Sequence, residues 1–146
     1  MSQVLNMFNS VGAEQFTNMI CQIAPYFSTI QPSMTTLRPG YAEATVPLRR
    51  EVTNHLGTMH AIALCNAAEL VAGTMTDASI PEGYRWIPKG MSVEYLAKVK
   101  TDIRAVADGS SIDWTQAGDQ IVPVDVFDTD GKKVFAARIT MNVKAA

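Results

Sequence analysis

Residues 60–76 read HAIALCNAAELVAGTMT and are the most informative segment of the chain. Because Ala and Leu, both strong helix formers, dominate this segment, the sequence predicts a helix over about residues 59–76 with Thr58 as its N-cap. The predicted helix is apolar on every side, which is typical of a helix buried inside a domain. Its main polar interruptions, Asn66 and Glu69, lie three residues apart and therefore share a face.

The segments on either side of this helix show mostly strand patterns. Before it, a helical spacing over residues 11–24 ends at Pro25, and alternating apolar residues over 42–48 predict a strand. Directly after it, residues 77–90 read as a loop because they are rich in Pro and Gly. Alternation then predicts four further strands, around residues 91–95, 99–105, 122–126 and 135–143.

This order of elements predicts the class of fold. Residues 128–131, Asp-Thr-Asp-Gly, predict a hairpin turn between the last two strands. A run of strands after one central helix is typical of an α+β domain, in which a curved antiparallel sheet wraps around the buried helix. We expect residues 1–146 to form a single domain that begins with a helical segment over about residues 1–35.

Composition and charge exclude several classes of protein. Twelve Lys and Arg nearly balance fourteen Asp and Glu, so we expect neither nucleic acid nor an anionic membrane as the partner. Cys21 and Cys65 form no disulfide framework and no CxxC metal motif, which fits a reducing compartment. The first ten residues lack the basic start and apolar run of a signal peptide, so we expect the cytoplasm.

The segment from Asn54 to Glu69, in this order of elements, resembles the hotdog-fold thioesterases. It is most similar to the small single-domain acyl-CoA thioesterases of the phenylacetate type. Their motif has an Asn or Gln, then a Gly, then His-Gly-Gly at the start of the helix, and an Asp or Glu nine residues after the His. Asn54, Gly57, His60 and Glu69 stand at these spacings, and the likeness covers about residues 35–145.

The resemblance implies hydrolysis of an acyl-CoA or acyl-carrier thioester, with Glu69 activating water or attacking the carbonyl directly. It implies that the Asn54 amide polarises the carbonyl and that His60 lies near the thioester sulfur. The residue types alone also allow a purely structural role for each of these three side chains. Asn54 could form a turn, His60 could make a structural hydrogen bond, and Glu69 could bond a buried backbone group. The Ala61 N–H, unpaired at the positive end of the helix, is the expected oxyanion donor.

Three further positions are expected to contact the substrate: Gly57, Ile62 and Asn66. Asn66 either orients Glu69, with which it shares a face, or packs as a polar core residue. The apolar side chains expected to line either an acyl pocket or the core are Phe27, Met59, Met75, Trp86 and Met91. We expect no metal, because His55 and His60 lie five residues apart and no carboxylate cluster joins them. Coenzyme A enters only as part of the substrate.

The chain departs from the family pattern at two places. Ala61-Ile62 replaces the Gly-Gly pair, and position 73, where one subgroup has a Thr four residues after the acid, is Gly. Thr74 follows and is expected to point elsewhere. These departures favour an alternative function, a hotdog protein that binds an acyl thioester or a lipid without turnover. A hydratase on the same fold is a third possibility, but its usual pairing of acid and His is not visible.

The resemblance also implies an oligomer. Hotdog thioesterases of this kind pair at least as homodimers, and dimers can associate into homotetramers. Their site usually lies between subunits, so that the acid comes from one chain while the helix start and the amide come from the other. A single copy of the fold in this chain implies the same arrangement, with Glu69 on one subunit and Asn54 and Ala61 on the next.

Overall fold

The computed structural model describes residues 2–146, and its central element is the buried helix α3, Ala61–Ser79. The helix predicted over residues 59–76 is confirmed, but it begins two residues later and ends three residues later than expected. His60, not Thr58, is its N-cap: the His60 Nδ1 accepts a hydrogen bond of 3.0 Å from the Ile62 N–H. The Thr58 hydroxyl is bonded instead to Asn54 in the loop before the helix.

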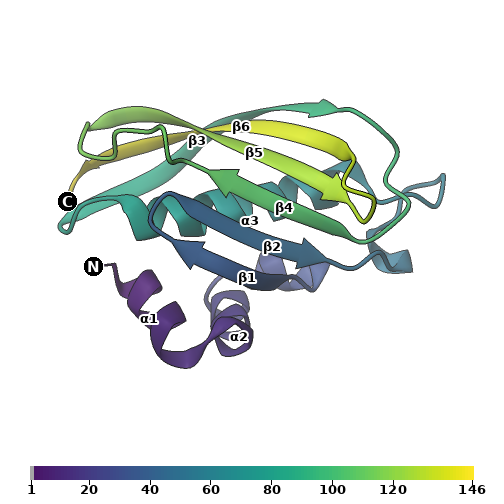
Figure 1. Ribbon diagram of the computed structural model, residues 1–146, viewed down its shortest axis with the longest axis horizontal. Helices are drawn as coiled ribbons and strands as arrows, with labels where there is room; N and C mark the ends of the chain where they lie inside the picture. The colour runs from purple at the N-terminus through teal and green to yellow at the C-terminus, as the bar shows by residue number, and fades with distance from the viewer. Residues whose placement is uncertain (1) are drawn as a thin grey trace.

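A six-stranded antiparallel sheet curves around α3 in the order β1-β2-β4-β5-β6-β3 (Figure 1). The strands are β1 (Ser33–Arg38), β2 (Tyr41–Val46), β3 (Tyr84–Tyr95), β4 (Ile103–Asp108), β5 (Gly118–Asp128) and β6 (Lys133–Ala145). This arrangement is the hotdog fold, so the predicted α+β class and the sheet wrapped around a central helix are confirmed. The predicted hairpin turn is also present, since the Gly131 N–H donates to the Asp128 carbonyl.

Two strands differ from the sequence prediction. β1 was not expected, because Thr35 and Thr36 interrupt the apolar pattern that its two buried residues, Met34 and Leu37, would otherwise show. The predicted loop over residues 77–90 is wrong, because α3 continues to Ser79 and β3 begins at Tyr84. Pro88 and Gly90 lie within β3, where a register shift accommodates them and where the free edge of the sheet tolerates a residue without an N–H.

The N-terminal segment covers the part of α3 that the sheet leaves open. It contains α1 (Gln3–Val11), α2 (Ala13–Ile23) and the 3₁₀ helix η1 (Pro25–Ile30), and a second 3₁₀ helix, η2 (Arg50–Val52), lies before α3. The single helix predicted over residues 11–24 is broken at Gly12, whose φ of 85° is not helical, but the predicted end before Pro25 is confirmed. α1 and η1 pack against α3, and α2 packs against β1 (Figure 1).

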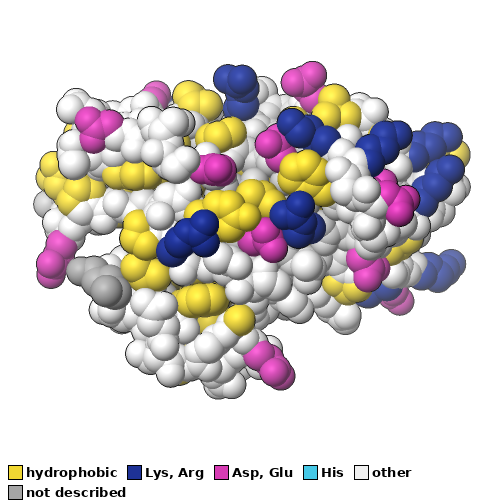
Figure 2. Space-filling view, viewed as in Figure 1, with side chains coloured by type: hydrophobic (Ala, Val, Ile, Leu, Met, Phe, Trp, Pro, Cys, Tyr) yellow, Lys and Arg dark blue, Asp and Glu magenta, His cyan; other side chains and the backbone are white. Residues whose placement is uncertain are grey.

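The core lies between α3 and the concave face of the sheet. Ala67, Ala68 and Ala72 of α3 are fully buried, and their small side chains let the strands approach the helix closely. The largest fully buried side chains are those of Phe16, Met34, Leu70, Met75, Phe135, Ile139 and Met141. On the face seen in Figure 2, acidic and basic side chains are interspersed with hydrophobic ones. No helix within residues 2–146 is long and apolar enough to cross a bilayer.

Candidate active site

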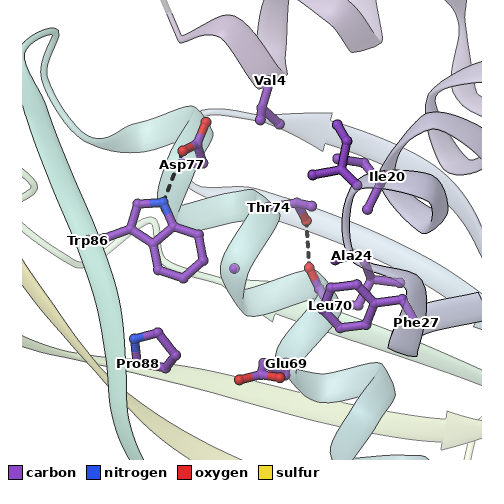
Figure 3. A pocket seen from close by; sticks show the side chains of 12 residues that line it. Val4, Ile20, Ala24, Phe27, Glu69, Leu70, Thr74, Asp77, Trp86 and Pro88 are labelled. Atoms are coloured by element: carbon purple, nitrogen blue, oxygen red, sulfur yellow. Dashed lines mark hydrogen bonds between the residues drawn. The ribbon is translucent and has the colours of Figure 1, made fainter.

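Glu69 faces a pocket of about 300 Å³ between α3, the N-terminal helices and the first half of β3 (Figure 3). The lining is almost entirely apolar. It consists of Val4, Ile20, Ile23, Ala24, Phe27, Glu69, Leu70, Gly73, Thr74, Asp77, Trp86 and Pro88. Phe27 and Trp86 therefore line a pocket as the sequence suggested, whereas Met75 is buried in the core. Met59 is also almost fully buried and borders a different pocket, at the start of α3.

Two of the three polar side chains in this pocket have partners in the protein. The Thr74 hydroxyl donates to the Leu70 carbonyl at 2.8 Å, and the Trp86 Nε1–H donates to Asp77 Oδ1 at 2.9 Å. Glu69 is half-buried and forms no hydrogen bond or ion pair with the other residues that the structure describes. This carboxylate is therefore free to contact a molecule in the pocket. The expectation that Thr74 points elsewhere is wrong, since it lines the same pocket.

The loop before α3 is closed by Asn54. Its Oδ1 accepts hydrogen bonds from the Leu56 N–H at 2.9 Å and the Thr58 N–H at 3.2 Å, and its Nδ2 donates to the Thr58 hydroxyl at 2.9 Å. Gly57 has a φ of 77°, which the tight turn requires and which other residues rarely adopt. In this chain, Asn54 and Gly57 thus shape the loop that leads into the helix.

The first turn of α3 leaves one backbone donor without an acceptor. The His60 side chain accepts a hydrogen bond from the Ile62 N–H. The His60 carbonyl accepts hydrogen bonds from the Ala63 N–H at 3.0 Å and the Leu64 N–H at 3.3 Å. The Ala61 N–H has no acceptor among residues 2–146. It lines a second pocket of about 300 Å³ together with Asn54 and Tyr95. The role of oxyanion donor stays a prediction for Ala61.

His60, Ile62 and Asn66 line a third hollow of about 380 Å³ on the other side of η1. The Asn66 Nδ2 donates to the Tyr26 carbonyl at 3.4 Å and to the Thr29 hydroxyl at 3.3 Å. The expectation that Asn66 orients Glu69 is therefore wrong. Side chains three residues apart on a helix point in directions that differ by roughly 60°. Here η1 lies between the side chain of Asn66 and that of Glu69.

Within one chain, the predicted site residues do not converge on one point. Glu69 follows Ala61 by eight residues, which places their Cα atoms about 12 Å apart along the helix axis. The two residues line separate pockets of the same subunit. A site shared between two copies of the chain, as the resemblance implied, stays a prediction.

Asp77 is the residue of this region that sequence reasoning missed. The signal was present, because positions 69, 73 and 77 follow one another at intervals of four and so lie along one face of α3. Cys65 offers no alternative nucleophile, since burial raises the pKa of its thiol and disfavours the thiolate. No three His, Cys, Asp or Glu side chains among residues 2–146 are grouped to hold a metal ion.

Comparisons with known proteins bear first on the family and the fold. Residues 12–143 match one family model, described as a domain of unknown function, DUF4442. The crystal structure of the genomics target APC5556 is 63% identical, with a TM-score of 0.90 over 99% of this chain and 97% of that chain. A search of curated proteins found no match.

Two more distant structures are thioesterases by name. The thioesterase HI1161 from Haemophilus influenzae is 18% identical, with a TM-score of 0.78 over 90% of each chain. A thioesterase family protein from Silicibacter pomeroyi is 16% identical, with a TM-score of 0.76 over 88% of this chain and 96% of that chain. At such identities the likeness establishes a shared fold.

Proposed function

We propose that this chain, which belongs to the DUF4442 family, hydrolyses an acyl thioester whose thiol is coenzyme A or an acyl carrier. The observation that carries the proposal is the unpartnered carboxylate of Glu69 at the edge of an apolar pocket. A pocket of this kind suits an acyl group, and a free carboxylate beside it suits a general base or a nucleophile. The named thioesterases among the structural neighbours support the same reaction class.

A homodimer through β3 completes the site in this proposal. Residues directly opposite each other on paired strands face the same side of a sheet. Met91 and Tyr95 pair with the buried Ile139 and Phe135, yet they are 39% and 62% exposed. The side chains on the inward face of β3 are thus only partly covered by α3. Because β3 also ends the sheet, a second β3 can pair with it about a two-fold axis.

Antiparallel pairing of two β3 strands brings the start of one beside the end of the other. The Glu69 pocket adjoins the first half of β3, at Trp86 and Pro88, and the Ala61 pocket adjoins its end, at Tyr95. The symmetric dimer would therefore set Glu69 of one subunit against the helix start of the other. Two such composite sites would form per dimer.

The reaction follows from these two groups. Glu69 removes a proton from water as the water oxygen attacks the thioester carbonyl, and the carbonyl oxygen gains negative charge. The free N–H at the helix start of the second subunit donates a hydrogen bond to that oxygen. Collapse of the tetrahedral intermediate breaks the carbon–sulfur bond, and the proton on Glu69 passes to the leaving thiolate. Direct attack by a Glu69 oxygen would instead expel the thiolate and form a mixed anhydride, which water then hydrolyses to the free acid and the Glu69 carboxylate.

The test is thiol release from acyl-CoA substrates by matched carboxylate variants. Glu69→Gln keeps the size of the side chain and removes the base, so the rate should fall by about 10²- to 10⁴-fold. Glu14→Gln, an exposed carboxylate in the first turn of α2, is the control and should retain the wild-type rate. A Glu69→Gln protein that hydrolyses as fast as wild type would refute the proposal.

One observation favours a second candidate, a protein that binds acyl thioesters without hydrolysing them. The Asn54 oxygen and one of its amide hydrogens are engaged within their own loop, so little of this side chain is free to polarise a carbonyl. Acyl-CoA binding by the wild-type protein with no thiol release would support this candidate.

A further inference from the structure

We propose that the Glu69 pocket binds an unbranched, unsubstituted acyl chain of about eight to ten carbons, and that Trp86 sets the upper limit of its length. The inference rests on the proposed function, because it names the acyl group of the thioester. It is argued from the shape of the pocket, its volume and the chemistry of its walls.

The pocket is elongated along α3. Glu69, Gly73 and Asp77 line it at intervals of four residues, so it follows the helix for about 12 Å. Glu69 lies toward one end and Asp77 toward the other, and the ring of Trp86 lies between them (Figure 3). An acyl group whose carbonyl is held beside Glu69 therefore extends along the helix past the ring of Trp86 toward Asp77.

The extent of the pocket along α3 suits a chain of medium length. The pocket is about 12 Å long, close to the extended length of a chain of about eight to ten carbons, and its volume of about 300 Å³ can hold such a chain. A short acyl group leaves most of it empty, and the rigid ring of a phenylacetyl group matches an elongated pocket less well than an unbranched chain with the same number of carbons.

The walls favour a hydrocarbon chain. Val4, Ile20, Phe27 and Leu70 supply apolar surface, while the Thr74 hydroxyl donates to Leu70 and one oxygen of Asp77 accepts from Trp86. Along the apolar stretch between Glu69 and Asp77, a polar substituent would lose its hydrogen bonds to water without gaining partners.

Trp86 forms one wall of the pocket between Gly73 and Asp77 and limits the space that a longer chain would need. Its Nε1–H is held by Asp77 at 2.9 Å, and its ring lies directly against the backbone of α3 at Gly73. A Cβ atom at position 73 would lie 3.0 Å from Cη2 of the indole, closer than side chains normally pack. Only Gly leaves room for this position of the ring, and the hydrogen bond to Asp77 holds the indole there.

The experiment measures acyl-chain length against affinity in the full-length Glu69→Gln protein, in which slow turnover keeps the ligand intact. Butyryl-, hexanoyl-, octanoyl-, decanoyl- and palmitoyl-CoA are titrated by calorimetry, with phenylacetyl-CoA as the aromatic probe. We expect Kd to fall about fourfold with each added methylene up to the medium chains. Palmitoyl-CoA should bind no more tightly than decanoyl-CoA. Equal affinities for butyryl- and decanoyl-CoA, or tightest binding of phenylacetyl-CoA, would overturn the proposal.

Variants that resize the pocket test the role of Trp86. Trp86→Phe should shift the preferred chain toward longer acyl groups, and Ala24→Leu, which fills the pocket from η1's side, should shift it toward shorter ones. Trp114→Phe removes the other tryptophan, outside the pocket, and should leave the preference unchanged. If neither Trp86→Phe nor Ala24→Leu moves the preference, the proposed acyl site is wrong.

The outcomes separate this inference from the proposed function. Chain-length-dependent binding by a wild-type protein that releases no thiol would refute hydrolysis and keep the acyl site. Thiol release at one rate for all chain lengths would keep the hydrolase and refute the acyl site.

Discussion

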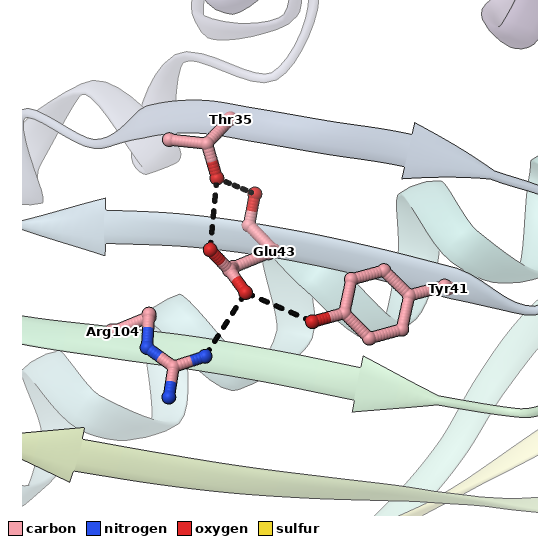
Figure 4. Close-up of polar contacts among 4 residues, drawn as sticks. All are labelled: Thr35, Tyr41, Glu43 and Arg104. Atoms are coloured by element: carbon pink, nitrogen blue, oxygen red, sulfur yellow. Dashed lines mark hydrogen bonds and ion pairs between the residues drawn. The ribbon is translucent and has the colours of Figure 1, made fainter. Parts of the chain in front are cut away.

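Two carboxylates of this protein, Glu43 and Glu69, occupy opposite kinds of environment. Glu43 lies on the outer face of the sheet and accepts hydrogen bonds from Tyr41 Oη at 2.9 Å, Arg104 Nη1 at 3.0 Å and Thr35 Oγ1 at 3.4 Å (Figure 4). Glu69 lies on the pocket side of α3 and has no such partner among residues 2–146.

The contrast distinguishes a carboxylate that stabilises the fold from one that is available for binding or catalysis. Around Glu43, β1, β2 and β4 each contribute a donor, so the charge is neutralised where it stands and links three strands. In the candidate active site, by contrast, the Glu69 carboxylate and the Ala61 N–H have no hydrogen-bond partner among residues 2–146. Groups without a partner in the protein are free to bond water or a ligand, and the proposed function assigns both of these to the ligand. The variants below test this difference.

After Glu69→Gln, the largest effect is expected from Ala61→Pro. Proline is favoured at the first position of a helix and lacks only the N–H that this position leaves free. His60 has the extended backbone that a residue before proline needs. We expect kcat to fall by about 10²- to 10³-fold, as when one oxyanion donor is lost, with the thermal midpoint nearly unchanged. Unaltered thioester hydrolysis by the folded variant would remove Ala61 from the site.

A smaller but more specific effect is expected when two inactive variants are mixed. In a mixed dimer of Glu69→Gln and Ala61→Pro subunits, one composite site loses both groups and the other keeps both. Random association makes half of the dimers mixed, so activity should recover to about one quarter of wild type. Co-expression of the two chains followed by a thiol-release assay measures this recovery. No recovery in verified mixed dimers would show that each site lies within one chain.

Stability should respond in opposite ways to the loss of the two charges. Glu43→Gln removes a charge-assisted network whose side chains are 20% exposed at Glu43 and 43% exposed at Arg104. We expect a loss of about 1 kcal/mol in the free energy of unfolding, with hydrolysis unchanged. Glu69→Gln should leave stability unchanged or raise it slightly. Urea unfolding compares the two, and a larger loss for Glu69→Gln would contradict the distinction between them.

The smallest effect concerns the titration of Tyr41. Burial, followed by the hydrogen bond from its hydroxyl to Glu43 and the charge of Glu43, raises the pKa of this phenol. The neutral phenol therefore contributes stability that is fully present below the ordinary tyrosine pKa of about 10 and is lost as pH rises through the higher pKa of the folded state. Glu43→Gln should move the Tyr41 pKa back toward the ordinary value. Absorbance titration of tyrosinate measures the shift, with Tyr41→Phe identifying the signal.

Much of the fold was predictable because local patterns and the final structure agree. The all-round apolar character of residues 60–76 required burial, and the strands after it follow from alternation with period two. Glu69 stood out because a charge on such a helix has no evident structural use. The hairpin at residues 128–131 follows from Asp and Gly in the turn.

Other features could not be predicted from local pattern. The first half of β3 contains Pro88 and Gly90, which signal a loop unless the segment lies at the edge of a sheet. Thr36 masks the alternation of β1, and His60 displaced Thr58 as the cap only because the loop before α3 engages Thr58 elsewhere. Each outcome depends on neighbours that are distant in sequence or on loop geometry.

The sequence by itself determined that a buried helix lies inside a curved antiparallel sheet and that this helix carries a carboxylate at Glu69. Periodicity and burial are properties of short segments, so they can be read before folding. Only the tertiary structure decided that Glu69, Asn66 and Ala61 open into three different hollows, and that Trp86 and the N-terminal helices enclose the first. Those placements depend on how η1 and β3 pack on α3, which is set by contacts between segments far apart in the chain.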